Sequence, residues 1–275
     1  MGHDKLRKFA ENETFSCLLQ PSSKELLADG FFSLRDHAVK GHWYPQMFPV
    51  QQPLVVELGC GKGEYTIDLA QRLPDRNYVG VDIKGARLWK GAKYATEHSL
   101  SNVAFLRTKV EFLEALFAPG EVSEIWLTFS DPQVRSENSR LTSPLFLERY
   151  RKFLAPGGVV HLKTDSRFLH EYTKAVCAAN GLEVLQCTDD LYGSPERLPM
   201  PELYEVQTFY EKMFLEQGYK ITYMSFRLEG ASSGLVSPGD AFDADYWRSV
   251  EGYRQLFGRD TAETRRQKIH AAEEE

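Results

Sequence analysis

The sequence predicts an α/β fold: a doubly wound, mostly parallel, seven-stranded sheet with helices on both faces. Short apolar runs alternate with amphipathic segments about seven times, at the spacing of βαβ units. Some of these runs are apolar throughout, as in PLVVELG at residues 53–59, which is typical of strands buried on both faces. Glycine or proline follows several of the segments and marks the turns between them.

The apolar patterns place each element in turn. Strands are expected at residues 53–59, 77–83, 102–108, 124–129, 159–164, 183–189 and 220–228. Helices are expected at residues 63–73, 86–98, 110–117, 144–154, 167–180 and 204–217, with Gly181 as a left-handed C-cap. These elements define a main domain at residues 51–228.

Two segments flank this domain. Residues 1–50 lack clear periodicity and are expected to form an N-terminal arm that packs on the main domain or moves beside it. Residues 229–275 read as a linker and a C-terminal extension, because ASSGLVSPGD is rich in turn residues. Aromatic residues after the linker suggest one docked helix, and the final RRQKIHAAEEE is expected to be solvated.

Composition indicates a cytoplasmic protein. Of the 275 residues 42% are hydrophobic, which supports a sizeable core, and no apolar run approaches the ~20 residues that span a bilayer. The N-terminal residues lack the apolar region of a signal peptide. The four cysteines form no C-x-x-C pair and no histidine cluster accompanies them, so free thiols and no metal are expected.

The charge lowers the expectation of a nucleic-acid partner without excluding one. The formal net charge is −6, whereas nucleic-acid-binding domains are usually basic. Residues 229–275 carry ten acidic and six basic side chains, so −4 of this charge lies in the extension. The remaining body is nearly neutral and can still present a basic face.

A glycine-rich turn follows the first predicted strand. GCGKGEY places glycines at Gly59, Gly61 and Gly63, and glycine lets a backbone approach a ligand closely. The pattern matches neither the dinucleotide fingerprint nor the P-loop, which ends in Gly-Lys-Ser/Thr. A purely structural turn would also explain the three glycines.

Two acidic residues at strand ends make a nucleoside ligand the favoured interpretation. Glu57 lies in an otherwise apolar strand, so its carboxylate needs a ligand or a backbone partner. Asp82 ends the second strand, where doubly wound folds place the acid that binds ribose hydroxyls. Without a pyrophosphate motif, S-adenosylmethionine fits the site. Asp82 could instead start the following helix as its N-cap.

The fourth strand ends in FSDPQVRSENSRLTS, with Asp131 where a ligand at the switch point would lie. A turn or N-cap role for Asp131 is the alternative. Methyltransferases that act on exocyclic amines have a second proline and an aromatic residue here. This sequence has neither, which points away from amino methylation.

Five motifs together carry a family resemblance. VELGCGKGEYTIDLA, NYVGVDIKGAR, TFSDPQ, HLKTDS and VQTFYE occur in this order over roughly residues 1–228 and resemble the bacterial tRNA (guanine-N7-)-methyltransferases. The resemblance implies a class I, Rossmann-like methyltransferase. Such an enzyme moves a methyl group from S-adenosylmethionine to guanosine at nucleotide 46 in the tRNA variable loop.

The resemblance also implies residue roles. Asp131 matches the catalytic residue. The cofactor positions are Glu57, Gly59, Gly61, Asp82, Thr108 and Asp131, although many members have Asp or Asn in place of Thr108. The substrate positions are Arg135, where the family usually has lysine, together with Asp165, Thr208 and Glu211. Asp165 could instead be a helix N-cap, and Glu211 could belong to a solvated helix face.

Two departures weaken the match to a tRNA-binding loop. Ser130 replaces a proline, and the basic run of the family is reduced to Arg135 and Arg140, interrupted by Glu137. Fewer phosphate contacts predict weaker tRNA affinity, or reliance on Lys5, Arg7 and Lys8 of the arm. A methyltransferase for a small molecule or protein, and a catalytically weak RNA-binding homologue, are the alternative functions. Whether the protein is a monomer or a homodimer stays open.

Overall fold

The computed structural model describes residues 2–28, 33–229 and 234–251. Its strands are β1 (Leu18–Leu19), β2 (Leu54–Leu58), β3 (Asn77–Asp82), β4 (Val103–Arg107), β5 (Val122–Thr128), β6 (Leu154–Thr164), β7 (Val184–Thr188) and β8 (Thr222–Arg227). Its helices are α1 (Gly2–Asn12), α2 (Ser23–Leu26), α3 (Trp43–Gln46), α4 (Glu64–Arg72), α5 (Gly85–Glu97), η1 (Val110–Ala115), η2 (Glu137–Ser139), α6 (Pro144–Arg151), α7 (Arg167–Ala179), α8 (Glu202–Glu205), α9 (Phe209–Glu216), η3 (Gly239–Ala241) and α10 (Ala244–Glu251).

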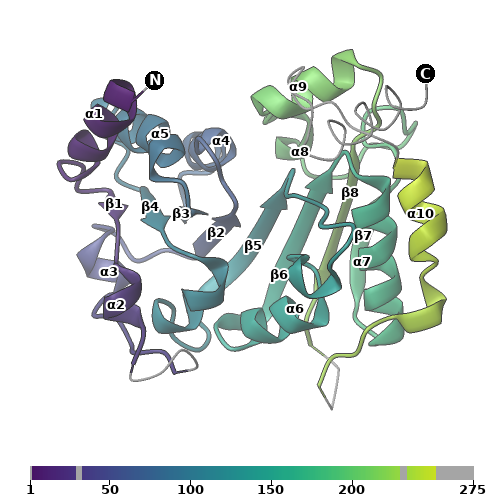
Figure 1. Cartoon of the computed structure of the whole chain (residues 1–275). Coiled ribbons are helices and arrows are strands. Elements are labelled where there is room, and N and C mark those ends of the chain that lie inside the picture. Colours follow the sequence, from purple (N-terminus) through teal and green to yellow (C-terminus); the bar gives the residue numbers. More distant parts are fainter. Residues whose placement is uncertain (1, 29–32, 230–233, 252–275) are drawn as a thin grey trace, which may run out of the picture.

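The described strands form one sheet in the order β1-β4-β3-β2-β5-β6-β8-β7 (Figure 1). Strands β1 to β6 pair in parallel, whereas β8 runs antiparallel to both β6 and β7. The strand order reverses between β2 and β5. That reversal is the switch point at which doubly wound sheets bind ligands, outside the carboxyl ends of the strands. The predicted α/β fold with a mostly parallel sheet is therefore confirmed.

The sheet has one strand more than the seven expected, and the N-terminal arm supplies it. Leu18 and Leu19 of β1 pair with Phe105 and Leu106 of β4, so the arm lies against the edge of the sheet. A two-residue strand shows no periodicity in the sequence. Its place depends on the edge that β4 leaves open, which only the assembled sheet provides.

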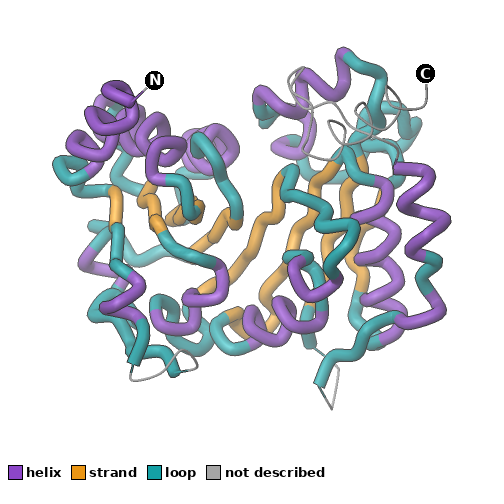
Figure 2. The backbone as a smooth tube through the Cα atoms, in the orientation of Figure 1, coloured by secondary structure: helices purple, strands orange, loops and turns teal. Residues whose placement is uncertain are grey.

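Helices cover both faces of the sheet, which appears as the central orange layer in Figure 2. One apolar cluster packs α4, α5 and α9 onto the sheet through Tyr65, Leu88 and Phe214. The other packs α6 and α7 onto the opposite face through Phe146 and Tyr172. None of the helices in the described part of the chain combines the length and apolar character needed to cross a bilayer.

The C-terminal extension lies against this second face. The ring of Phe242 packs edge-on against Phe168 and Tyr172 of α7, at centroid distances of 5.2 and 5.3 Å. Helix α10 follows along α7 (Figure 1). The docked helix expected in this segment corresponds to α10, whereas the charged end RRQKIHAAEEE, residues 265–275, lies outside the described residues.

Three local expectations are corrected. The helix expected at 204–217 is two helices, because the backbone is extended at Val206 and Thr208 begins α9 as its N-cap. The segment expected to be helical at 110–117 is the 3₁₀ helix η1. Residues 155–158 are expected to separate a helix from a strand, but they lie within β6. The pairing register between β5 and β6 shifts at this point.

Gly63→Ala is expected to lower the free energy of unfolding by about 2–4 kcal/mol. Gly63 has φ +73°, and an added Cβ would overlap the ring of Phe105, so the substitution combines backbone strain with overpacking. Gly120→Ala is the matched control: Gly120 has the same φ, but no described heavy atom lies within 4 Å of the added Cβ. Denaturant unfolding of both variants measures the difference, and equal losses would contradict the packing argument.

Candidate functional site

The glycine turn between β2 and α4 lies at the switch point. Gly59, Gly61 and Gly63 have φ values of +77°, +59° and +73°, which side chains with a Cβ rarely adopt. A Cβ at Gly59 would meet no heavy atom of the described residues within 4 Å. The turn is therefore both a sharp backbone change and an open edge at which a ligand can reach main-chain groups.

Glu57 is buried beneath this turn and has protein partners. Its Oε2 accepts a hydrogen bond from the backbone N–H of Thr66 at 2.9 Å and another from the Thr66 hydroxyl. Its Oε1 accepts from the Thr128 hydroxyl at 2.5 Å. Burial raises the pKa of the Glu57 carboxyl, and these hydrogen bonds oppose that shift. The carboxylate thus joins α4 to the end of β5 at the switch point.

Asp82 fixes the glycine turn to the end of β3. Its two carboxylate oxygens accept from the backbone N–H of Gly61 at 3.0 Å and of Lys84 at 2.7 Å. Lys84, not Asp82, holds the N-cap position of α5, so the N-cap alternative is wrong. Asp82 is only 9% exposed, so both carboxylate contacts lie in a nearly buried position next to the turn.

Thr108 follows β4, the strand next to β3. Its side chain is buried, and its hydroxyl has no hydrogen-bond partner among the residues that the structure describes. Asp82 pairs in register with Arg107, so Thr108 lies one residue beyond the end of the neighbouring strand. A buried hydroxyl without a partner is rare and calls for a ligand or water.

The loop after β5 carries Asp131 on a strained backbone. Phe129 and Gln133 have φ values of +50° and +47°, which are uncommon for residues with side chains. Asp131 is exposed, and its Oδ1 accepts from the backbone N–H of Gln133 at 3.0 Å. The turn interpretation therefore holds, whereas Ser143 caps α6, so Asp131 is not its N-cap. The Ser130 hydroxyl is buried without a partner within the described chain.

Arg140 does not face a substrate, contrary to the expectation for this loop. It is 4% exposed and donates to the carbonyl oxygens of Gln133 and Val134, both at 3.2 Å. Its guanidinium lies over the rings of Phe168 and Tyr172, 4.7 and 4.3 Å from their centroids. Arg140 therefore holds the loop after β5 in place, and Arg135 is the exposed arginine of this segment.

Asp165 and Thr208 lie at the starts of helices. Asp165 follows β6 and is 6% exposed, but Ser166 is the N-cap of α7, accepting from the N–H of Leu169 at 3.1 Å. The N-cap alternative for Asp165 is therefore wrong. Thr208 is the N-cap of α9, where its hydroxyl accepts from the N–H of Glu211 at 3.2 Å.

Glu211 lies in a buried ion pair, so the alternative of a solvated helix face is wrong. Both Glu211 and Lys163 of β6 have fully buried side chains, with 2.8 Å between Lys163 Nζ and Glu211 Oε1. The Tyr192 hydroxyl also donates to Oε1, at 2.6 Å, and Oε2 has no hydrogen-bond partner in the described structure. Sequence reasoning did not identify Lys163, although a lysine within the apolar run VVHLKT was a signal.

Helix α9 lies next to both ligand loops. The backbone N–H of Phe209 donates to Glu64, the first residue of α4, at 3.0 Å, and Lys62 of the glycine turn lies over the Phe209 ring. On its other side Phe214 stacks near Phe129, 6.4 Å between centroids. Helix α9 thus meets the glycine turn and the loop of Asp131 above the carboxyl ends of the strands (Figure 1).

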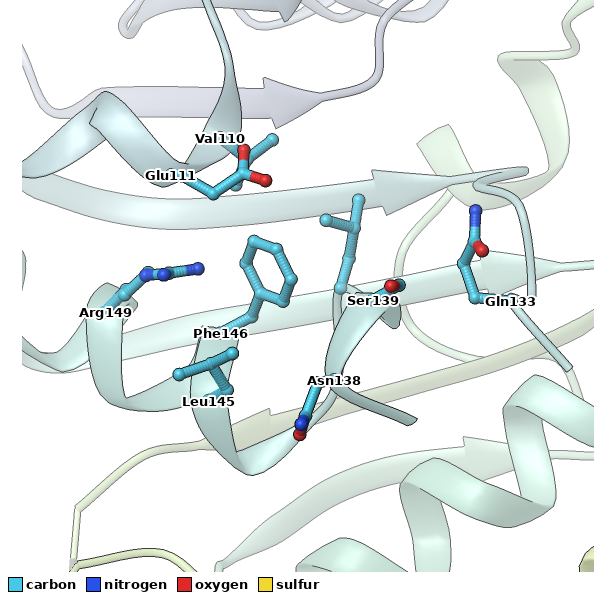
Figure 3. A pocket seen from close by; sticks show the side chains of 9 residues that line it. Val110, Glu111, Gln133, Asn138, Ser139, Leu145, Phe146 and Arg149 are labelled. Atoms are coloured by element: carbon cyan, nitrogen blue, oxygen red, sulfur yellow. The ribbon is translucent and has the colours of Figure 1, made fainter. Parts of the chain in front are cut away.

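A pocket of about 380 Å³ opens beside the Asp131 loop (Figure 3). Its walls come from Val110 and Glu111 of η1, from Gln133, and from Phe146 and Arg149 of α6. Gln133 belongs to both regions, since its N–H bonds Asp131 while its side chain lines the pocket. The lining is mixed, with apolar Val110 and Phe146 beside polar Glu111, Gln133 and Arg149.

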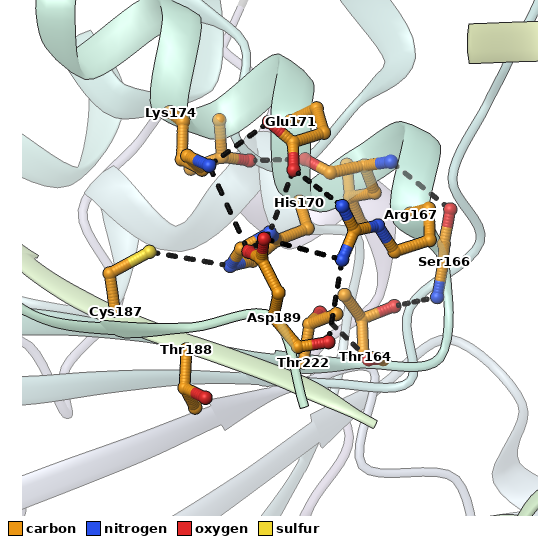
Figure 4. A network of polar contacts seen from close by, with 12 residues as sticks. Thr164, Ser166, Arg167, His170, Glu171, Lys174, Cys187, Thr188, Asp189 and Thr222 are labelled. Carbon is orange, nitrogen blue, oxygen red and sulfur yellow. Dashed lines mark hydrogen bonds and ion pairs between the residues drawn. The ribbon is translucent and has the colours of Figure 1, made fainter. Parts of the chain in front are cut away.

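A second polar network lies on α7 and β7 (Figure 4). Ligand atoms of His170, Cys187 and Asp189 lie within 4.8 Å of one another, but Asp189 is already near Arg167 and Lys174, at 3.5 and 3.8 Å. Cys187 is exposed, but partial desolvation of its sulfur raises the pKa of the thiol, which disfavours the thiolate that a metal requires. The absence of a metal in this protein stays a prediction.

Comparison with known proteins agrees with this geometry. The family model described as "Putative methyltransferase" matches residues 51–224. The chain is 49% identical over 228 residues to a tRNA (guanine-N(7)-)-methyltransferase of Christiangramia forsetii, covering 82% of this chain and 98% of that protein. It is 44% identical over 254 residues to the protein of that name in Bacteroides thetaiotaomicron, covering 90% and 95%.

A solved structure supports the fold alone. The crystal structure of the 16S rRNA methyltransferase KamB matches with a TM-score of 0.50 and 17% sequence identity, covering 66% of this chain and 91% of that chain. Together with the identity to curated relatives over most of their length, these findings show that the chain belongs to the tRNA (guanine-N7-)-methyltransferase family.

Proposed function

We propose that the protein transfers a methyl group from S-adenosylmethionine to N7 of guanosine at nucleotide 46, in the variable loop of tRNA. Relatives named tRNA (guanine-N(7)-)-methyltransferase support the reaction. The observation that carries the proposal is the group of acids and unpartnered hydroxyls at the switch point. Glu57, Asp82, Thr108, Ser130 and Asp131 all follow or end strands at one edge of the sheet.

The residues at this edge fit the methyl donor. Asp82 presents its carboxylate beside the glycine turn, where ribose hydroxyls can donate to it, and Gly59 and Gly61 allow close approach of the backbone. The unpartnered hydroxyl of Thr108 and the adjoining pocket at Val110 and Gln133 suit the adenine ring. Bound there, S-adenosylmethionine supplies an electrophilic methyl group.

The substrate side is formed by the loop after β5 and by α9. Arg135 is suited to a tRNA phosphate, because a guanidinium binds phosphate oxygens in a bidentate manner. Asp165, Thr208 and Glu211 would orient the nucleotide through its donor groups. Since tRNA is a cytoplasmic substrate, we also propose that the protein acts in the cytoplasm.

Asp131 is the proposed catalytic residue. Guanine N7 has a lone pair and no proton, so the reaction needs no general base to expose the nucleophile. The enzyme must instead hold N7 in line with the methyl group at near-attack distance. The exposed carboxylate of Asp131 can accept the N1–H and exocyclic amine of the base, and it stabilises the positive charge that develops on the purine.

A methylation assay on tRNA transcripts tests the proposal. Transcripts with guanosine at nucleotide 46 should incorporate methyl groups, and those with adenosine there should not. The product should be 7-methylguanosine by nucleoside analysis. Methylation of small molecules or proteins, but not of tRNA, would support the alternative of a methyltransferase with another substrate. Tight tRNA binding without turnover would support the alternative of a catalytically weak RNA-binding homologue.

Arg135→Ala is expected to reduce the slope of log affinity for tRNA against log salt by about 0.7–0.9, as loss of one phosphate contact predicts. Arg135 is exposed on the loop that follows Asp131. The control is Arg227→Ala, because Arg227 ends the antiparallel strand β8 and pairs with Glu183 at the opposite end of the sheet. Filter binding over a salt series measures both slopes, and an unchanged slope for Arg135→Ala would exclude the phosphate contact.

A further inference from the structure

Lys163 is a buried cation with no role among the predicted site residues. Its side chain on β6 is fully buried, and a buried ammonium is costly unless its donors are satisfied. Besides Glu211, its Nζ donates to the carbonyl oxygens of Leu203 and Val206, at 2.6 and 3.1 Å. Three acceptors match the three protons of the ammonium.

All three acceptors belong to one segment, the α8–α9 joint at residues 203–211. Leu203 lies in α8, Val206 is its C-cap, and Glu211 lies in the first turn of α9. Thr208, the proposed substrate residue, lies between them as the N-cap of α9. Lys163 therefore holds the α8–α9 joint, which carries Thr208 and Glu211, against the sheet.

Lys163 also provides the charge that balances Glu211. Burial raises the pKa of the Glu211 carboxyl, and the Lys163 ammonium is the main influence opposing that shift. The other titratable groups that interact with it are Tyr192, which donates to Oε1, and Tyr65 of α4. Neither of these groups is a cation, so the charge that favours an ionised Glu211 comes from Lys163.

The two carboxylate oxygens of Glu211 have different surroundings. Oε1 receives Lys163 and Tyr192, whereas Oε2 is buried without a partner in the described structure. We propose that Lys163 is a positioning residue for the tRNA nucleotide, because it holds the α8–α9 joint against the sheet and orients Glu211 so that Oε2 is left without a partner among the described residues. This inference rests on the proposed function and assigns to β6 a part in substrate recognition.

Lys163→Met tests the inference, with Lys212→Met as the control, because Lys212 is an exposed lysine on α9 next to Glu211. At pH 7 the KM for tRNA should rise about tenfold in Lys163→Met, with affinity for S-adenosylhomocysteine within about threefold of wild type. Loss of the cation raises the pKa of the Glu211 carboxyl further and reduces its ionised fraction, so the KM ratio to wild type should fall toward one as pH rises to 9. Lys212→Met should behave as wild type.

A double variant separates charge from packing. Lys163→Met/Glu211→Gln cannot regain an ionised carboxylate, so its KM ratio should stay high and independent of pH. A pH-independent loss in Lys163→Met itself, or a wild-type KM, would overturn the inference. If Lys163→Met does not fold, Lys163→Gln decides instead, because its neutral amide can still donate to the buried carbonyl oxygens: a raised KM at pH 7 that recovers toward pH 9 supports the inference, and a wild-type KM rejects it.

The same assay distinguishes the two proposals. Wild-type turnover on guanosine 46 with an unaltered Lys163→Met rejects the inference alone. Absence of wild-type turnover on that transcript rejects the proposed function, and with it the nucleotide role of Lys163.

Discussion

Asp131→Ala is expected to lower the rate of methyl transfer to tRNA by about 10³-fold. The carboxylate is exposed at the end of β5, where it can hold the base and offset the positive charge that forms on the purine. Affinity for S-adenosylmethionine should stay within about tenfold of wild type, because Glu57 and Asp82 remain in place. Single-turnover kinetics and calorimetric titration measure the two effects separately.

Two controls accompany Asp131→Ala. Asp131→Asn can retain the hydrogen bond from the Gln133 N–H and thus the turn, but it removes the charge, so its rate should also fall strongly. Asp75→Ala removes an exposed aspartate just before β3, at the opposite end of the sheet, and should leave the rate unchanged. Full turnover by Asp131→Ala would remove Asp131 from the mechanism.

Asp82→Ala is expected to weaken cofactor binding about 100-fold, because hydrogen bonds to a charged acceptor contribute roughly 1.5–3 kcal/mol each. The change also removes the acceptor of the Gly61 N–H, so the glycine turn loses its link to β3. Calorimetric titration with S-adenosylhomocysteine gives the affinity. Asp82→Asn, which keeps an acceptor without the charge, should lose about tenfold.

Thermal unfolding separates binding from structure at Asp82. If Asp82 serves only to hold the backbone at Gly61 and Lys84, Asp82→Ala would lower the melting temperature while leaving the affinity within about threefold of wild type. That result would contradict the cofactor role of this residue.

The sheet was predictable because buried parallel strands leave a strong signal. Each of the seven expected strands corresponds to one in the structure, from the apolar run of β2 to β8. The acids at strand ends were also visible, since a carboxylate such as Glu57 within an apolar run is conspicuous. What failed were features that depend on tertiary contacts, as with β1, whose two residues form a strand only beside β4.

The burial and pairing of charged residues could not be predicted from the sequence either. Arg140 and Glu211 read as surface residues in the sequence, yet one lies over two aromatic rings and the other in a buried ion pair. Their partners Phe168, Tyr172 and Lys163 are distant in the chain or on other elements. A sequence pattern reports which side chains are charged, whereas burial and pairing depend on elements that meet only after folding.

The position of β8 has a consequence for synthesis on the ribosome. β8 is the last strand of the described sheet in the chain, yet it lies between β6 and β7, and β7 pairs only with β8 in the described sheet. In a nascent chain that ends after β7, this strand therefore has no partner strand in the described sheet. It also carries the exposed apolar residues Val184 and Leu185. Unpaired edges invite association with other chains, so β7 is open to such association during the interval before β8 emerges.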